Sequence, residues 1–584
     1  MVAEGREHGP LSPENQDNRQ PVGSGINDFG LRVELTTPSG PSSVFSSLCT
    51  LCLCGYCLFQ EVYKRVRCQL IVLAHPRRLL SLAHAAVVCL VVSIGFPGMV
   101  GAADSDPLAG LPARVESIRT DWGVPGVAVA VVQGNRTVYS GGFGVLGVHD
   151  DRSVTPQTVF GIGSATKAFT AAAAAMLVEE GVLNWDDPVR TIVPEFHLRD
   201  GQATLNCTLK DLLTHRTGLP RHDALWYRSD LGRDEMIERL RYLESSAPFR
   251  DRFQYSNLMY MVAGRLIGQA SASTWEAFVQ RRILGPLGMS RTFFEGAPQP
   301  ESNVAQPHRL GPSDVALSVP PYRGWAIGPA LSMCSSADDM GRWLKVHLAV
   351  GHGDRQTILP DEVLKTLHQP IVTVATPPTQ ESPLSAYALG WFAQTYRGRL
   401  MVHHVGSIDG FYSLVAFLPF EDIGIVVLTN RSRNRVPEVI SRWVFDRLLG
   451  LNEINWNKRY REEHHTLLEL ENAEWTRINA LKDLNVPPTF PLDGYVGSYD
   501  HPAYGRLTVN FREDGDLTGE FRDLAGWLEH LTGETFIFHF DAEGLGDRFI
   551  MTFASPDGDR INAVAARLQS GVAPVVFERV EEES

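Results

Sequence analysis

The sequence predicts an α+β fold followed by a small, separate β domain. Two stretches with helical spacing of apolar residues, one beginning at Ser164 and one after Asn257, precede a series of short strand-like segments between residues 387 and 430. From residue 487 onward, apolar residues alternate with other residues, and turn signals such as Asp557-Gly558 recur at short intervals. These patterns indicate helices packed on an antiparallel sheet, followed by a terminal β domain of barrel type.

The first helix carries a serine and a lysine on one face. A turn-rich approach from Thr158 to Gly163 leads into an alanine-rich segment, in which apolar residues recur at helical spacing: Phe169, Ala172, Ala173, Met176 and Leu177. Residues three apart lie on the same side of a helix, so the side chains of Ser164 and Lys167 are neighbours. We therefore place Ser164 in the first turn of a buried helix.

The remaining elements follow from apolar periodicity and turn residues. Two β-branched runs, 126–132 and 137–142, predict a hairpin across Gly134-Asn135. Further helices are predicted after Asn257 and over residues 329–344 and 436–449, and consecutive antiparallel strands over 387–394, 400–404, 411–418 and 423–430.

Composition excludes some classes of partner and cross-link. The formal net charge is −14 with no Lys/Arg-rich block, which argues against a nucleic-acid partner. Six of the eight cysteines precede residue 100, so a disulfide framework does not hold the fold together. A single bridge between Cys207 and Cys334 stays open.

The first hundred residues read as an extension and a targeting segment. We interpret 1–78 as a disordered, cysteine-containing extension and 79–102 as a signal peptide or signal anchor, because Arg77-Arg78, an apolar run and small residues follow one another. The close spacing of the cysteines within 49–57 disfavours a structural zinc site and favours acylation near a membrane or an extension of no structural role. We expect secretion or membrane anchoring in the secretory pathway, with mitochondrial targeting as the alternative.

Three Asn-x-Ser/Thr triplets follow the apolar run, at Asn135, Asn206 and Asn430, and they fit a secretory lumen. The main domain is assigned to 103–450. A charged segment at 451–486 reads as an exposed helical connector, and 487–584 form the terminal β domain.

Three separate motifs carry a resemblance to a known family. Ser164-Ala165-Thr166-Lys167, Tyr255-Ser256-Asn257 and His404-Val405-Gly406 occur in the order and approximate spacing of the class C β-lactamase and penicillin-binding-protein-like serine hydrolases, a group similar to peptidase family S12. The stretch Leu212 to Pro220 also resembles that family. The resemblance covers about residues 106 to 450 and implies an antiparallel sheet with flanking helices plus an all-helical insert, with the active site between them. The tail resembles the lipocalin-like domain of some members.

The motif residues suit nucleophilic catalysis. A serine hydroxyl needs a neighbouring base, and Lys167 can serve only if burial or a nearby cation keeps it neutral. Tyr255 can relay or accept the proton, and Asn257 can orient the substrate or Lys167. The resemblance implies an oxyanion hole formed by the backbone N–H groups of Ser164 and Ser407. Gly406 and Gly410 are expected to let the strand pass close to substrate.

Three features leave choices open. His215 is a candidate general base, although a histidine followed by Arg-Thr-Gly-Leu-Pro more often supports a helix end and turn. His404 stands where many relatives carry lysine, and a histidine that is mostly neutral at pH 7 should hold a substrate carboxylate more weakly. We therefore expect neutral esters or peptides to be preferred over β-lactams. Leu331 follows Pro329-Ala330 where relatives usually have glycine, and it either narrows the pocket or packs harmlessly.

The function expected from these residues is metal-independent and cofactor-independent serine hydrolysis of an amide or ester, on a small-molecule or peptide substrate, as in the related β-lactamases, D-aminopeptidases and esterases. The alternative is a catalytically weak scaffold or binding protein that keeps the fold. A zinc hydrolase using His403 and His404 is disfavoured, because adjacent strand residues point to opposite faces. A homo-oligomer is compatible with the sequence.

Overall fold

The computed structural model describes residues 106–294, 302–311, 315–322, 324–352, 357–512, 515–542, 546–569 and 571–581. The predicted extension, the cysteine cluster and the apolar targeting segment lie outside these residues. Among the helices that are described, none is both long and apolar enough to cross a membrane.

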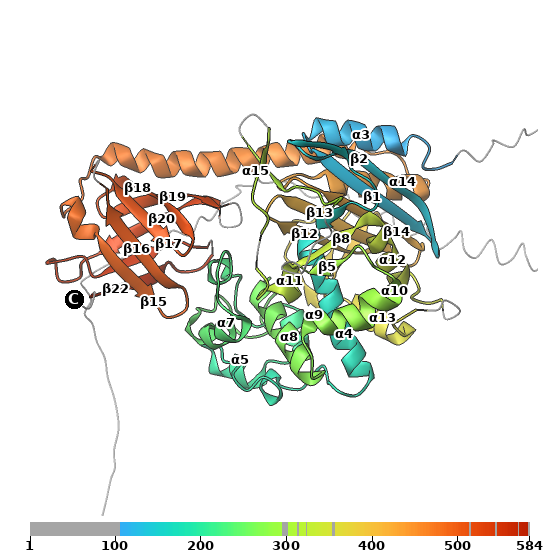
Figure 1. Ribbon diagram of the computed structural model, residues 1–584, viewed down its shortest axis with the longest axis horizontal. Helices are drawn as coiled ribbons and strands as arrows, with labels where there is room; N and C mark the ends of the chain where they lie inside the picture. The colour runs from blue at the N-terminus through green and yellow to red at the C-terminus, as the bar shows by residue number, and fades with distance from the viewer. Residues whose placement is uncertain are drawn as a thin grey trace, which may run out of the picture. The chain divides into compact units, whose positions relative to one another are not determined.

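A nine-stranded antiparallel sheet organises the main domain (Figure 1). The sheet contains the predicted hairpin and the predicted run of strands. The two groups are joined because the first strand of the hairpin pairs with the last strand of the run, with Val129 opposite Val427. In spatial order the strands are β3 (Asp150–Ser153), β2 (Arg136–Gly147), β1 (Gly126–Gln133), β14 (Ile423–Thr429), β13 (Phe411–Leu418), β12 (Arg399–Ile408), β11 (Phe392–Tyr396), β10 (Ser385–Tyr387) and β9 (Val372–Thr373).

Both faces of the central strands are covered by helices. In β1, Val127, Val129 and Val131 join one apolar cluster, while Ala128 and Ala130 join the other. The first cluster is completed by α3 (Leu111–Asp121) and α14 (Val436–Leu448), and the second by α4 (Thr166–Glu179) and α12 (Ala337–His347). This two-sided burial explains why β1 reads as a continuous apolar run.

An all-helical region packs against α4. Its central helix, α8 (Asn257–Ala270), contacts α4 directly, and the short helix α11 (Gly328–Leu331) lies against both. The other helices of this region and its surroundings are α5 (Gly201–Asn206), α6 (Leu209–Leu213), α7 (Arg233–Arg239), α9 (Trp275–Val279), α10 (Gly285–Leu287) and α13 (Asp361–His368).

Two predicted elements are interrupted. The helix expected over 329–344 is split into α11, strand β8 (Met333–Ser336) and α12, because β8 pairs with β4 (Val159–Gly161) and β5 (Phe293–Phe294). The strand expected over 387–394 breaks at Gly390, where φ is +79°. A Cβ at Gly390 would lie 2.8 Å from the carbonyl oxygen of Lys167, so the break also lets the chain approach α4.

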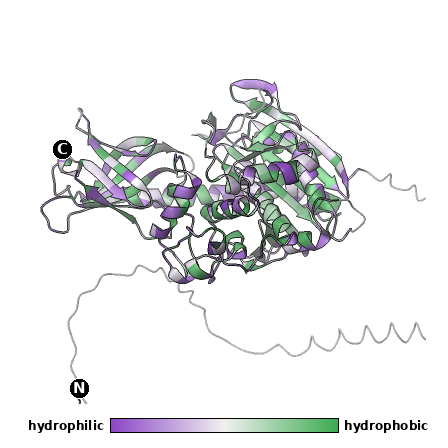
Figure 2. Ribbon diagram, turned by 60° about the horizontal axis from the view of Figure 1, so that its bottom comes forward, coloured by the Kyte–Doolittle hydropathy of each residue, from purple (hydrophilic) through white to green (hydrophobic). Residues whose placement is uncertain are grey.

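The C-terminal part consists of a helix and a closed barrel. In helix α15 (Trp456–Asn479) Trp456 is buried and the other residues are exposed or half-buried, which fits a charged connector. Hydrophobic and hydrophilic residues alternate along the barrel strands (Figure 2), which agrees with the predicted pattern. The strands are β15 (Gly497–His501), β16 (Gly505–Phe511), β17 (Leu517–Phe521), β18 (Leu524–Thr532), β19 (Thr535–Ala542), β20 (Gly546–Ala554), β21 (Ala563–Ala566) and β22 (Val575–Val580).

The structure decides two smaller questions. Cys207 and Cys334 are both buried and do not form a disulfide with each other. Asn135 and Asn206 are exposed, whereas Asn430 is fully buried. Its side-chain oxygen accepts from the Gly126 N–H at 2.6 Å and its Nδ2 donates to the Leu146 carbonyl at 3.0 Å. The Asn430 amide is therefore inaccessible to glycosylation in the folded chain.

Candidate active site

Ser164 lies where a strand turns into a helix. Strand β4 leads into the 3₁₀ turn η1 (Gly163–Ala165), which continues as α4. Gly163 has a φ of +49°, and a Cβ there would lie 2.8 Å from the backbone nitrogen of Ser407. The glycine thus brings the backbone of β12 beside the serine. The Ser164 residue is 9 % exposed, so it is reachable at the end of a largely buried turn.

Lys167 is fully buried one turn after Ser164. Its Nζ lies 3.0 Å from Ser164 Oγ, 2.7 Å from Asn257 Oδ1 and 2.9 Å from the carbonyl oxygen of Ala330. Burial, reinforced by the positive charge of Arg221, lowers the pKa of Lys167 well below its usual value. A neutral amine has two hydrogens and one lone pair. Because Asn257 Oδ1 and the Ala330 carbonyl can only accept, both hydrogens go to them and the lone pair is left for the Ser164 hydroxyl.

Asn257 is held in this orientation by a carboxylate. It is the first residue of α8 and only 2 % exposed. Its Nδ2 donates to Asp223 Oδ1 at 3.2 Å, which turns its oxygen toward Lys167. Asp223 also accepts from the Trp226 indole N–H at 2.7 Å and from Arg221 Nε at 2.5 Å. Asp223 therefore fixes the amide that orients the lysine.

Tyr255 lies between two basic side chains. Lys167 Nζ is 4.7 Å and the Arg221 guanidinium carbon is 5.2 Å from the centroid of its ring. Burial raises the pKa of Tyr255 above its usual value, although a hydrogen bond with Ser164 and the charge of Arg221 oppose the rise. Tyr255 is consequently a phenol at neutral pH, which can donate a proton or pass one on.

His215 buttresses this segment instead of contacting Ser164. Its Nδ1 accepts from the Ser256 N–H at 3.1 Å, and its carbonyl accepts from the Gln254 N–H at 2.8 Å. The ring lies 4.4 Å from that of Tyr255, and the residue adopts a φ of +58°. Because burial lowers the pKa of His215 well below its usual value, it is a neutral support of the turn. Of the two readings of His215, the geometry favours the structural one.

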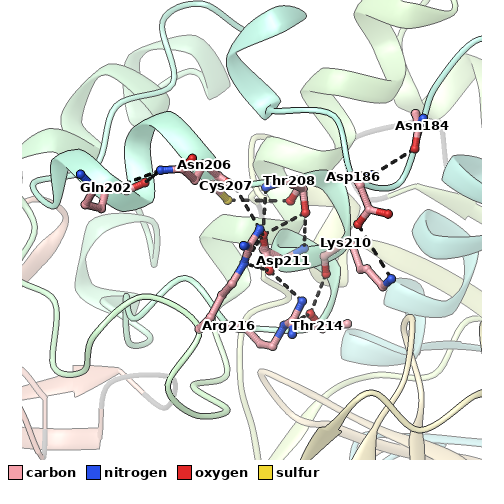
Figure 3. Close-up of polar contacts among 11 residues, drawn as sticks. Asn184, Asp186, Gln202, Asn206, Cys207, Thr208, Lys210, Asp211, Thr214 and Arg216 are labelled. Atoms are coloured by element: carbon pink, nitrogen blue, oxygen red, sulfur yellow. Dashed lines mark hydrogen bonds and ion pairs between the residues drawn. The ribbon is translucent and has the colours of Figure 1, made fainter.

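A buried ion cluster holds the segment before His215 (Figure 3). The carboxylate of Asp211 is fully buried and forms ion pairs with Arg216 at 2.8 Å and with Arg250 at 2.6 Å. It also closes a capping box with Thr208 at the start of α6. Both arginines reach the same carboxylate from outside the helix, so Asp211 ties two segments to α6: the turn directly after His215, through Arg216, and the segment that carries Arg250.

His404 is neutral and enclosed. It is 1 % exposed, and burial lowers its pKa to about 3. Its Nδ1 lies 2.6 Å from the Val405 carbonyl oxygen and its Nε2 lies 3.0 Å from the Tyr387 hydroxyl. His403 instead contacts Gln394 Oε1 at 2.8 Å through Nε2. The two imidazoles therefore serve different neighbours, and in the described ranges no group of three or more metal-binding side chains could hold an ion.

Gly406 in β12 and Gly410 in the turn after it both lie against other parts of the chain. A Cβ at Gly406 would lie 1.8 Å from the carbonyl oxygen of Ile162, and one at Gly410 would lie 2.3 Å from Pro307. The close approach of Gly406 is thus to the segment that carries Ser164. Ser407 itself is exposed, with its backbone beside Gly163.

An apolar cavity of about 350 Å³ adjoins this end of β12. Ile408 lines it and shares a face of the strand with His404 and Gly406, because residues two apart point the same way. Gly161, from the strand that leads to Ser164, and Phe411 line it as well.

The structure adds three groups that the motifs did not reveal: Arg221, Asp223 and the carbonyl of Ala330. Arg221 directly follows Leu219-Pro220 and Asp223 lies two residues further on, so charged residues after a proline turn were the available signal. No side-chain pattern could reveal a backbone carbonyl. Leu331 is 3 % exposed and packs within the apolar core.

The segment that holds these residues matches a known protein family. A family model described as β-lactamase matches residues 113–448, which hold every residue of the site. The chain belongs to the β-lactamase family. A second model, a domain of unknown function (DUF3471), matches residues 481–579 and includes most of the barrel.

Relatives of this β-lactamase-family protein include hydrolases. "Unguisins hydrolase ungD'" of Aspergillus campestris is 31 % identical over 419 residues, covering 68 % of this chain and 76 % of the relative. "Protein flp" of Staphylococcus aureus is 28 % identical over 325 residues, covering 54 % of this chain and 62 % of the relative. Among solved structures, the octameric penicillin-binding protein homologue of Pyrococcus abyssi aligns with a TM-score of 0.55 and 24 % identity over 81 % of this chain and 100 % of its own. This last likeness supports the penicillin-binding-protein-like fold.

Proposed function

We propose that this protein is a serine hydrolase that cleaves an amide or ester through an acyl-enzyme on Ser164. The arrangement around Lys167 carries the proposal. Two acceptors occupy the amine hydrogens, and the lone pair faces the Ser164 hydroxyl at 3.0 Å. A base prepared in this way beside a serine suits nucleophilic catalysis.

The reaction would proceed in two steps. Lys167 takes the proton of Ser164 Oγ as the oxygen attacks the substrate carbonyl carbon. The oxyanion is stabilised by the backbone N–H groups of Ser164 and Ser407. The Tyr255 phenol supplies a proton to the leaving amine or alcohol and regains one from Lys167, so that no proton is gained or lost overall. Water then attacks the acyl ester, and the same groups return Ser164 to its starting state.

The proposed substrate preference rests on His404 and the apolar cavity. A neutral, enclosed imidazole offers no charge to a carboxylate on its side of the site, which favours neutral esters or peptides over penicillins. The cavity beside Ile408 suits an apolar group of the substrate. The relatives named as unguisins hydrolases support hydrolysis as the reaction class. Efficient penicillin hydrolysis at neutral pH would contradict this preference.

A fluorophosphonate probe tests the proposed nucleophile, because it labels activated serines. We expect the purified chain to be labelled, Ser164→Ala to lose the label, and Ser140→Ala to retain it as the matched control. Ser140 lies in β2 and contacts Asp338, away from the residues of the site. Labelling that persists in Ser164→Ala, or no labelling of the folded wild type under any condition, would overturn the proposal. The second result would favour the scaffold alternative.

A further inference from the structure

A second hollow, of about 740 Å³, lies where the main domain meets the barrel. Pro321, Tyr322 and Asp409 line both this hollow and the apolar cavity beside Ile408, so the two spaces adjoin. We call the second space the junction hollow. Its other walls come from the loop 228–230, from Pro320 and from the barrel turn between β17 and β18, which contributes Arg522 and Asp523. A substrate that extends beyond the apolar cavity therefore reaches the barrel.

The lining of the junction hollow carries charges of both signs. Arg228 and Arg522 are positive, and the negative groups are the carboxylates of Asp230, Asp409 and Asp523. Each peptide unit offers one N–H donor and one carbonyl acceptor and has no net charge. A wall that holds both donors and acceptors therefore suits a peptide chain better than an alkyl chain or an ion of one sign.

Arg522 brings hydrogen-bond donors of the barrel to this hollow. Its terminal nitrogens donate to the carbonyl oxygens of Tyr227 at 3.4 Å and Tyr504 at 3.2 Å. Asp523, the next residue of the turn, pairs with Arg228 at 4.0 Å, and Arg522 forms no ion pair within the described ranges. Burial lowers the pKa of Arg522 to about 10, so it keeps its charge at neutral pH. Because a guanidinium has five N–H groups, Arg522 retains donors for further carbonyl oxygens.

Asp409 supplies an acceptor to the same hollow. It is 5 % exposed, and its Oδ2 accepts from the Tyr227 hydroxyl at 2.6 Å. Its Oδ1 has no partner on another described residue. Because a buried carboxylate oxygen without a hydrogen bond is costly, this atom favours a ligand that donates one. Asp409 also follows Ser407 by two residues, so the hollow begins near the proposed oxyanion hole.

We propose that the junction hollow binds an uncharged peptide that continues the acyl part of the substrate. Arg522 of the barrel donates to a peptide carbonyl, and Asp409 accepts from a peptide N–H. The inference rests on the proposed function, which assigns the two ends of the substrate. Tyr255 supplies the proton to the leaving group and lines neither cavity, so both cavities belong to the acyl part. The substrates selected are neutral peptide esters or amides with an apolar side chain next to the scissile bond and further peptide units before it.

Two 4-nitrophenyl esters of different length test the proposal. One is the ester of N-acetyl-leucine and the other that of N-acetyl-glycyl-glycyl-leucine, with leucine in the configuration that the wild type hydrolyses faster. Both are neutral and share the leucyl group and the leaving group, so they differ only by two peptide units. We expect kcat/KM of the wild type to be about 10-fold higher for the longer ester, because the transition state uses binding energy from remote groups.

Arg522→Leu should lose most of this ratio, and the ratio cancels any loss of activity that both esters share. Arg579→Leu is the matched control. Arg579 is a half-buried arginine of the barrel that also donates to backbone carbonyls, those of Gly494 and Ile561 at 3.1 Å, and it lines neither cavity. The control should keep the wild-type ratio.

Ser229→Trp tests the hollow without removing a charge. Ser229 is half-buried and lines the hollow, so an indole there fills the space and should also lower the ratio. This variant replaces Arg522→Leu if that protein does not fold. A wild-type ratio near one would overturn the proposal. An unchanged ratio in a folded Arg522→Leu or Ser229→Trp variant, or an equal fall in Arg579→Leu, would overturn it as well.

The two proposals fail in different ways. If the wild type hydrolyses the shorter ester and Ser164→Ala does not, the proposed function stands whatever the ratio shows about the junction hollow. If the folded wild type hydrolyses neither ester, the proposed function fails and the role of the hollow fails with it.

Discussion

At the scale of single residues, the protonation of Lys167 decides what the site can do. An ammonium group would donate all three hydrogens and leave Ser164 without a base, whereas the neutral amine accepts the serine proton. Burial and Arg221 both favour the neutral form, and Asp223 opposes them less strongly. Tyr255, Tyr260 and the neutral rings of His215 and His404 complete the surroundings of the amine.

The substitution Lys167→Arg tests whether the side chain acts as the base for Ser164. Arginine stays protonated where Lys167 is neutral, so it cannot accept the serine proton. We expect kcat/KM for a neutral ester to fall about 10³-fold, within the range for losing a general base. Lys365→Arg, on an exposed ion pair, is the control for the substitution type. Circular dichroism checks folding, and a folded Lys167→Arg variant within about 10-fold of wild type would contradict a neutral base.

Sequence and structure differ in how far they specify this site. The spacing of Ser164 and Lys167 follows from helical geometry, so the sequence alone could place them together. Arg221 and Asp223 were not foreseen, because only the folded turn brings them to Tyr255 and Asn257. Likewise, the sequence predicted a mostly neutral His404 from its ordinary pKa, but the enclosure that lowers this pKa to about 3 depends on Tyr387 from another strand.

At the scale of elements, α6 and the loop after it depend on one buried carboxylate. Asp211→Asn removes the charge that faces Arg216 and Arg250 and weakens the capping box of α6. Because the carboxylate is buried while both arginines are partly exposed, the expected loss is about 1–3 kcal/mol, which corresponds to a fall in Tm of a few degrees.

Differential scanning calorimetry checks this prediction. Asp186→Asn is the matched control, because Asp186 is 74 % exposed and its ion pair with Lys210 is 3.9 Å long. That variant should melt within about one degree of wild type, since exposed pairs contribute little. Equal melting temperatures for the two variants would show that Asp211 does not hold the segment.

Element boundaries followed the sequence where burial was simple. Strands β1, β13 and β14 and helix α14 match their predicted ranges closely, because apolar runs and turns mark both ends, whereas β2 and β12 run five and four residues beyond their predicted ends. The single helix predicted over 329–344 was wrong, because Met333–Ser336 forms a strand that pairs with strands far away in the chain. Local periodicity does not encode such pairings.

At the scale of the whole molecule, the barrel contacts the loop that carries Arg221. The Tyr504 hydroxyl lies 2.6 Å from His222 Nδ1, and Gln569 Oε1 accepts from the His222 N–H at 2.5 Å. His222 is buried and adopts a φ of +46° between Arg221 and Asp223. The barrel thus helps to hold a strained residue that separates two groups of the site.

Tyr504→Phe measures this connection. Losing one hydrogen bond costs only about 1 kcal/mol of stability, but a looser loop should lower kcat/KM about 10-fold. Tyr499→Phe removes a comparable bond within the barrel, to the Tyr495 carbonyl at 2.8 Å, and should leave kcat/KM unchanged. Equal activity of both variants would mean that the barrel does not position the loop.

Buried histidines predict a loss of stability in mild acid. His347 and His368 contact each other at 2.9 Å, and burial lowers the pKa of His347 well below its usual value and that of His368 to about 3. In the unfolded chain both titrate near pH 6.5, so the unfolded state binds more protons below that pH and is favoured there.

The free energy of unfolding should therefore fall from about pH 6.5 to 4.5, by up to about 1.4 kcal/mol per pH unit for each histidine. Urea unfolding at several pH values measures the slope. His368→Phe should reduce it, whereas exposed His465→Phe should not. A slope of zero over this range would contradict the neutrality of the pair.

The proposed mechanism depends on acylation of Ser164. Mixing the wild type with a slowly deacylating aryl ester, quenching in acid and mapping the peptides by mass spectrometry should place the acyl group on Ser164, with none on the corresponding peptide of Ser164→Ala. Hydrolysis of the ester that proceeds without an adduct and survives in Ser164→Ala would contradict the account.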